Sequence, residues 1–133
     1  MAGFSRYLQR ELLDHALKTG AYTPPTNISV ALFTAAPSDT GGGTEVSGLG
    51  YARVTHNVWA AASDASPSVA SNTGAVEFPA PGVGGWGLVT HFALFDDEGT
   101  PNLLGWAALT VQKTINESDD VSFPAGDLEI TLD

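Results

Sequence analysis

Residues 86–95, WGLVTHFALF, decide the fold class of this chain. Successive side chains of an extended strand fall on opposite faces, here Trp86, Leu88, Thr90, Phe92 and Leu94 on one face and Val89, His91, Ala93 and Phe95 on the other. This period of two predicts a β-strand, and both faces are largely apolar. We therefore expect a central strand that is covered on both sides.

Similar patterns recur on both sides of this stretch. Residues 96–102, DDEGTPN, form a turn cluster, and residues 103–111 return as the second strand of a hairpin. Further strands are predicted at residues 28–34, 51–59, 75–78 and 121–123, and at the C-terminus, where Leu128, Ile130 and Leu132 alternate with Asp127, Glu129, Thr131 and Asp133. About six to eight short strands between turn signals predict a mainly β chain, built as an antiparallel β-sandwich or small barrel.

The N-terminal region has a different period. Apolar residues recur at steps of three and four over residues 4–19, which predicts one amphipathic helix. Lys18 and Gly20 are helix stop signals, and Pro24 and Pro25 prevent any continuation. We favour packing of this helix against its own sandwich over an extension toward a partner.

The whole chain, residues 1–133, is expected to form a single domain, with the sandwich over residues 27–133. Residues 35–50 and 60–74 are rich in small and polar side chains, so we predict long loops there. In an assembly, such loops can be ordered by a neighbouring subunit.

Composition excludes several classes of function. The chain has no cysteine and a formal net charge of −10, from 5 basic and 15 acidic residues. A nucleic acid or an anionic membrane would need a basic face, so neither is an expected partner. Disulfides and thiolate zinc sites need cysteine and are excluded. Charged residues make up 15% of the chain, a low share that suggests that partners cover part of the surface.

No group of residues has the spacing of a metal site. His15, His56 and His91 lie far apart in the sequence, so we interpret them as structural or surface histidines. The adjacent acids at 96–98 and 119–120 could supply oxygen ligands to a cation, but they are also ordinary turn residues. We favour the turn role and assign no cofactor and no metal ligand.

No catalytic motif is present either. Residues 41–43 are three glycines that resemble a phosphate cradle, but Glu45 would repel a phosphate and no helix follows. Ser47 lacks the G-x-S-x-G frame of a nucleophile elbow. A glycan hydrolase would need two carboxylates that converge in a cleft, and nothing in the sequence selects such a pair. We predict that the chain is not an enzyme and assign no catalytic residue.

The three tryptophans differ in their surroundings. Trp86 and Trp106 lie in apolar strand patterns, which are typical of core residues. Trp59 ends a predicted strand beside a loop of small residues. Trp59 is therefore the best candidate for a contact with a sugar or a protein partner.

Several segments carry a resemblance to a known family. They are the helical start, LFTAAPSDTGGGTEVSGLGYARV (residues 32–54), WGLVTHFALFD (86–96), NLLGWAAL (102–109) and KTINESDDVSFPAGDLEITL (113–132). In this order, over essentially the whole chain, they resemble a family of small tailed-bacteriophage virion proteins, labelled as tail-fibre-like, minor tail or capsid decoration proteins. No catalytic residue is associated with that family, so none is carried over.

The resemblance implies a non-enzymatic structural protein located in the virion. A compact module of this size fits a capsid decoration (cement) protein that stabilises the head and binds the major capsid protein or other virion proteins. Similarity to decoration proteins also implies a homo-oligomer, with a trimer favoured. The alternative is a small tail-associated protein, tail-fibre-like or minor tail, that acts in assembly or binds the host surface. The sequence leaves both locations open.

Overall fold

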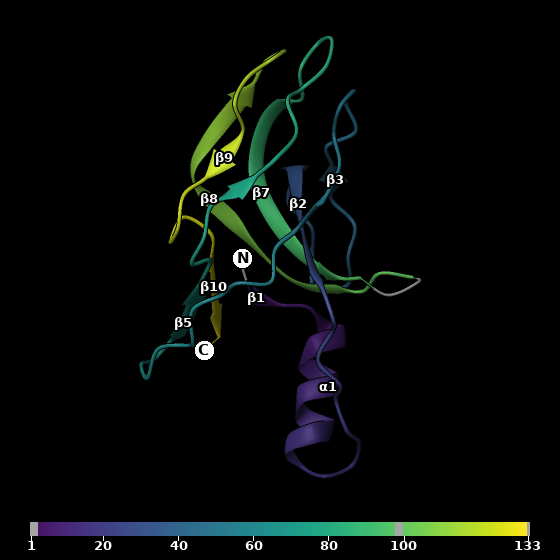
Figure 1. Cartoon of the computed structure of the whole chain (residues 1–133). Helices are drawn as coiled ribbons and strands as arrows, with labels where there is room; N and C mark the ends of the chain where they lie inside the picture. Colours follow the sequence, from purple (N-terminus) through teal and green to yellow (C-terminus); the bar gives the residue numbers. More distant parts are fainter. Residues whose placement is uncertain (1–2, 98–99, 133) are drawn as a thin grey trace.

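The computed structural model describes residues 3–97 and 100–132. Within them, one helix, α1 (Arg6–Ala16), lies near the N-terminus, and every strand pair is antiparallel (Figure 1). The strands are β1 (Gly3–Phe4), β2 (Ile28–Ala35), β3 (Thr44–Glu45), β4 (Val54–Thr55), β5 (Ser68–Ser71), β6 (Val76–Glu77), β7 (Gly87–Asp96), β8 (Leu103–Ile115), β9 (Ser122–Phe123) and β10 (Glu129–Leu132). The mainly β, antiparallel class with one N-terminal helix is confirmed. Of the predicted turn and final strand, Glu98, Gly99 and Asp133 lie outside the described residues.

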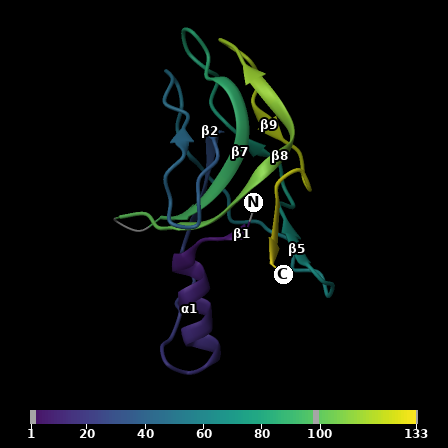
Figure 2. The same ribbon diagram turned by 180° about the vertical axis from the view of Figure 1, so that it is seen from behind.

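β7 is the middle strand of the main sheet, as its two apolar faces predict. The strand order is β1–β8–β7–β2–β3, and β4 also pairs with β2. β7 and β8 form the predicted hairpin, and Figure 2 shows them as two long, curved strands side by side. Two small sheets, β5–β10 and β6–β9, complete the β structure of the described residues.

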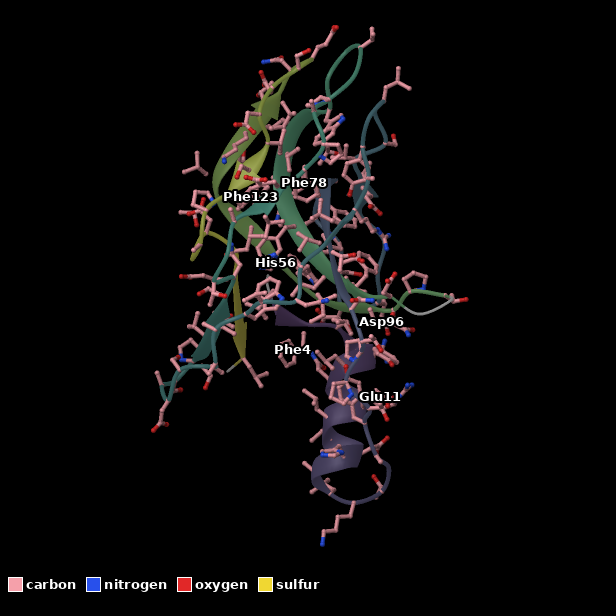
Figure 3. The ribbon with its side chains drawn as sticks, viewed as in Figure 1. Phe4, Glu11, His56, Phe78, Asp96 and Phe123 are labelled. Atoms are coloured by element: carbon pink, nitrogen blue, oxygen red, sulfur yellow. The ribbon has the colours of Figure 1, made fainter. Side chains whose placement is uncertain are left out.

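The principal core is shared by the main sheet and the two small sheets. Leu32 and Phe92 of the main sheet are buried in one cluster with Phe123 of β9 and Ile130 of β10. Phe123 also meets Phe78 edge to face, with ring centroids 6.0 Å apart (Figure 3). Burial of these large apolar side chains is the main force that holds the two layers together.

The opposite face of the main sheet is covered as well. Ala31, Phe33, Ala93 and Trp106 form a second buried cluster, against which Phe95 packs. The ring of Phe95 stacks on that of Phe33 with centroids 6.4 Å apart. The expected cover on both sides of the central strand is therefore confirmed.

One part of the predicted alternation is wrong. The register of β7 against β8 shifts between Val89 and His91. Val89 is consequently buried in the principal core with Phe92, whereas strict alternation places it on the opposite face. Leu88, which alternation places beside Phe92, is 47% exposed. An irregularity of this kind changes which face a residue takes, and the sequence does not mark its position.

The helix is shorter than the predicted range of 4–19. Phe4 belongs to β1, and the Ser5 side chain caps the helix by accepting a hydrogen bond from the Leu8 N–H at 3.2 Å. At the other end, Lys18 adopts a left-handed φ of 62°. This conformation is usual just after a helix, although glycine takes it more often than lysine.

The predicted loops and one predicted strand need correction. β3 lies within the predicted loop 35–50, and β5 within the predicted loop 60–74. Of the strand predicted over 51–59, β4 is the part that pairs, and Trp59 makes an isolated bridge to Asn72. The small residues of β5 form a strand because β10 supplies a backbone partner, so tertiary pairing overrides local preference here.

Candidate interaction surface

An apolar groove runs along the end of the molecule from which α1 projects. It consists of two adjoining hollows of about 350 and 260 Å³, which share Phe4, Ile28, Leu94 and Ile130. Trp59, Ala70 and Leu132 line the part toward β5 and β10, and Leu12 and Tyr22 line the part toward α1. Figure 3 shows Phe4 between α1 and β10. Adjoining apolar hollows of this kind are typical of a surface that binds a partner.

The helix α1 extends away from the sheets (Figure 1, Figure 2), and its Leu8 and Leu12 line one part of the groove. Leu8 is its buried side chain, and Leu12 packs against the principal core while staying half-buried. Leu13 and Leu17 are 61% and 70% exposed. The first turns of α1 therefore pack against the β structure of the same chain, as expected, and its last turns extend into solvent.

A polar hollow of about 750 Å³ lies beside the start of α1. Arg6 and Arg10, one helical turn apart, line it together with Asp39 and Asn102. Arg10 also forms an exposed ion pair with Glu11 at 2.7 Å. Among the described residues that line this hollow, Asp39 is the single acid. The two convergent carboxylates of a glycan hydrolase are therefore not brought together here.

A polar network holds the long segment after β3 against the main sheet. Arg53 donates two hydrogen bonds to the Glu45 carboxylate, at 2.9 and 2.8 Å. The Tyr51 hydroxyl donates to the same carboxylate at 2.8 Å and accepts from the Leu32 N–H at 3.0 Å. The Arg53 guanidinium also lies over the Phe95 ring, 3.8 Å from its centroid.

This network shifts the pKa values of its members. Burial raises the pKa of Glu45, but the hydrogen bonds from Arg53 and Tyr51 outweigh burial and lower it below its ordinary value. Burial is also the main cause that raises the pKa of Tyr51, with the charge of Glu45 adding to it. Around neutral pH, Glu45 and Arg53 are therefore both charged, and Tyr51 is neutral.

The three tryptophans take the places that the sequence predicts for them. Trp86 and Trp106 are buried, at 6% and 4% exposure. Trp59 is half-buried and lines the apolar groove, and its indole N–H donates to the His56 carbonyl at 2.9 Å. Trp59 is thus part of a candidate contact surface, with its polar end already bonded.

The histidines do not come together. The rings of His15 and His56 bond to backbone groups at 3.2 and 2.9 Å, and His91 Nδ1 lies 2.7 Å from the Thr90 hydroxyl oxygen. In the part of the chain that the structure describes, no three His, Asp or Glu side chains gather as they would around a metal ion.

Asp96 and Asp119, one acid from each acidic run, and the glycine run serve turns, and Glu98 lies outside the described residues. Asp96 accepts from the Asn102 N–H at 2.7 Å and from its side-chain amide at 2.9 Å. Figure 3 shows Asp96 near the start of α1. Asp119 accepts from the Asn116 N–H at 2.7 Å. The glycines at 41–43 have φ values of 101°, 79° and 75° and lead into β3, so they form a turn and not a phosphate cradle.

The sequence predicts neither the groove nor the Glu45–Arg53 pair. The groove residues come from elements far apart in the chain, and each alone has the pattern of a core residue. One feature of the sequence does point to an exposed apolar surface. Leu13 and Leu17 make the apolar stripe of the helix wider than a single packed face needs.

Comparison with known proteins agrees with the resemblance. Residues 3–131 match the family described as "Podophage GP4 fiber I protein gp80". No curated protein matches the chain. Among the described residues, no helix combines the length and apolar character required to cross a membrane. The match covers nearly the whole chain, and the chain belongs to the Podophage GP4 fiber I protein gp80 family and is a component of a phage virion.

Proposed function

We propose that the chain is a subunit of a fibre associated with the phage tail. The family match over residues 3–131 carries this proposal, because the family is described as a fibre protein. It supports the tail-associated alternative better than the capsid decoration role that was first favoured. The decoration role draws on the resemblance, the acidic, cysteine-free composition and the small size of the chain, and all three suit a compact subunit in either place.

The role that we propose is structural and does not involve catalysis. The carboxylates of Asp96 and Asp119 bind backbone groups of their own turns, and that of Glu45 pairs with Arg53. These acids therefore act within the fold. The partners in this proposal are virion proteins, including further copies of the chain, which would cover the apolar groove and the projecting part of α1.

The surroundings of Trp59 favour a protein partner over a sugar. Its indole N–H is already bonded within the fold, and its ring lies among apolar side chains such as Ile130 and Leu132. A sugar site needs polar groups that are free to bond hydroxyls, whereas a protein contact is usually built around apolar and aromatic residues. We therefore propose a role in assembly in preference to direct binding of host glycans.

A cryo-EM map of the intact particle tests the location. The expected result is density at the tail into which the curved β7–β8 hairpin with its projecting helix fits. Density distributed over the capsid lattice would overturn the tail proposal in favour of decoration. Particles grown without the gene provide the control, since they should lack the same density.

A further inference from the structure

We propose that α1 of one copy of the chain docks, through Leu13 and Leu17, into the apolar groove of a second copy. This inference rests on the proposed fibre role and deepens it, because it identifies the surfaces through which subunits join. Four observations carry it: the second stripe of the helix, the anchoring of the helix in its own copy, the apolar groove and the distribution of charge.

The helix has two stripes on different faces. Leu8 and Leu12 face the core of their own copy. A second stripe follows at steps of four, three and four along the sequence, and consists of Arg6, Arg10, Leu13 and Leu17. This spacing places the four side chains on one face of a helix, turned away from the packed one. Its outer end is apolar and exposed, as a docking helix requires.

The helix cannot fill the groove of its own copy with this second stripe. Its start is tied down by β1, by the Ser5 N–H, which donates to the Leu104 carbonyl at 2.8 Å, and by the Arg6 N–H, which donates to the Asp39 carbonyl at 2.9 Å. Turning Leu13 toward the groove would withdraw Leu8 from the core. A second copy presents the same leucines without that constraint.

The groove offers a matching surface. Its floor is formed by Phe4, Ile28, Leu94 and Ile130, and Leu132 at its rim is 48% exposed. Two leucine side chains would enter these hollows from an approaching helix. Burial of the exposed leucines and of the groove lining would then be the main driving force for association.

Charge complementarity favours a second copy as the occupant. Residues 6–18 contain three of the five basic residues of the chain and two acids, namely Arg6, Arg10 and Lys18 with Glu11 and Asp14. The other residues contain two basic and thirteen acidic residues. The helix of one copy is therefore attracted to the β part of another, whereas two β parts repel each other.

The contact joins two different surfaces of the chain, and two copies that exchange it reciprocally form a closed dimer. Repeated from copy to copy, such a contact closes into a ring or continues as an open chain. The homo-oligomer expected from the resemblance is compatible with each closed arrangement, the favoured trimer included.

Cysteine cross-linking tests the contact directly. Because the chain has no cysteine, Leu17→Cys and Leu132→Cys each introduce a single thiol. We expect an equimolar mixture of the two variants, one with a mass tag, to form a disulfide-linked heterodimer under mild oxidation on a non-reducing gel. Val83→Cys is the matched control, since Val83 is 74% exposed and lies outside the groove lining. No heterodimer, or equal linkage of Leu17→Cys to Val83→Cys, would overturn the proposal.

Light scattering coupled to size-exclusion chromatography provides a second measurement. The wild type is expected to elute as an oligomer at micromolar concentration, and the Leu13→Gln, Leu17→Gln double variant as the 13.8 kDa monomer. Far-UV circular dichroism should stay unchanged, because both side chains are exposed. Leu49→Gln, at a residue 66% exposed, should keep the wild-type mass.

A monomeric wild type, or a double variant that stays oligomeric, would overturn the self-docking proposal. Either result would leave the groove available to a different virion protein. The fibre role itself is decided separately by the particle map, so a failure of this inference is distinguishable from a failure of the proposed function.

Discussion

Asn72 and Leu128 exchange two hydrogen bonds at the point where β5 ends and β10 is about to begin. The Leu128 N–H donates to Asn72 Oδ1 at 2.9 Å, and the Asn72 N–H donates to the Leu128 carbonyl at 3.3 Å. The Asn72 side-chain amide also donates to the carbonyls of Gly74 and Pro124, at 2.7 and 3.0 Å. Asn72 is 1% exposed, so these hydrogen bonds are shielded from solvent. One side chain thus satisfies backbone groups that lie beyond the ends of both strands.

Asn72→Ala is expected to lower the free energy of unfolding by about 2–4 kcal/mol, because each buried group left without a partner costs about 1–3 kcal/mol. Urea denaturation followed by tryptophan fluorescence measures the loss. Asn116→Ala, in an exposed turn, is the matched control and should change stability by less than about 0.5 kcal/mol. Equal losses in the two variants would show that the buried network does not matter.

Glu45→Gln tests the ion pair with Arg53. At neutral pH the variant is expected to be less stable than the wild type by about 1 kcal/mol, since the pair is bidentate and half-exposed. The folded-state pKa of Glu45 lies below its ordinary value of 4.5. The contribution of the carboxylate is therefore fully present above about pH 4.5 and is lost as the pH falls through the folded-state pKa. Urea midpoints of both proteins across this range measure it, and a difference that does not change with pH would contradict the assignment.

Tyr51→Phe removes the hydroxyl that joins Glu45 to the Leu32 N–H in the middle of β2. We expect a loss of about 1–2 kcal/mol in the free energy of unfolding, because the Leu32 N–H loses its acceptor. Tyr22→Phe is the control, because Tyr22 is half-buried like Tyr51 but lies outside the network of Glu45 and Arg53. Chemical denaturation of both variants at neutral pH compares them, and a Tyr51→Phe protein as stable as the control would remove the hydroxyl from the network.

Trp86→Phe and Trp106→Phe form a matched pair. The Trp86 indole N–H donates to the Leu49 carbonyl at 3.1 Å, whereas Trp106 Nε1 is buried with no hydrogen-bond partner among the described residues. Both variants lose apolar contact, but only Trp86→Phe also removes a hydrogen bond, the one to the Leu49 carbonyl, which keeps its bond from the Gly82 N–H at 2.8 Å. We expect Trp86→Phe to cost about 1 kcal/mol more than Trp106→Phe in thermal or urea denaturation. The reverse order would show that the Trp106 indole has a polar partner in solution.

Much of the fold could be predicted because its main strands have strong local patterns. The alternation in residues 86–95 and 103–111 predicts the β7–β8 hairpin. The recurrence of apolar residues at steps of three and four over residues 4–19 predicts α1. Weak elements were missed for a physical reason: β5 pairs because β10 lies beside it, and its own residues do not favour a strand. That residues 1–133 form a single domain stays a prediction.

The candidate surface was less predictable than the fold. Trp59 was singled out from its position beside a loop of small residues, and it does line the groove. Phe4, Ile28 and Ile130 were interpreted as ordinary members of a helix or strands. The sequence shows that a side chain is apolar. Whether that side chain is covered depends on which other segments of the chain pack over it.

The sequence by itself determined the mainly β class, the central strand with two apolar faces, the acidic and cysteine-free character and the resemblance to phage virion proteins. These follow from local period and composition, which do not depend on how distant segments meet. The tertiary structure alone decided that Val89 turns inward, that Glu45 pairs with Arg53, and that an apolar groove lies open beside a helix with exposed leucines. Each of these depends on register and on contacts between distant segments, and both are set by the packing of the whole chain.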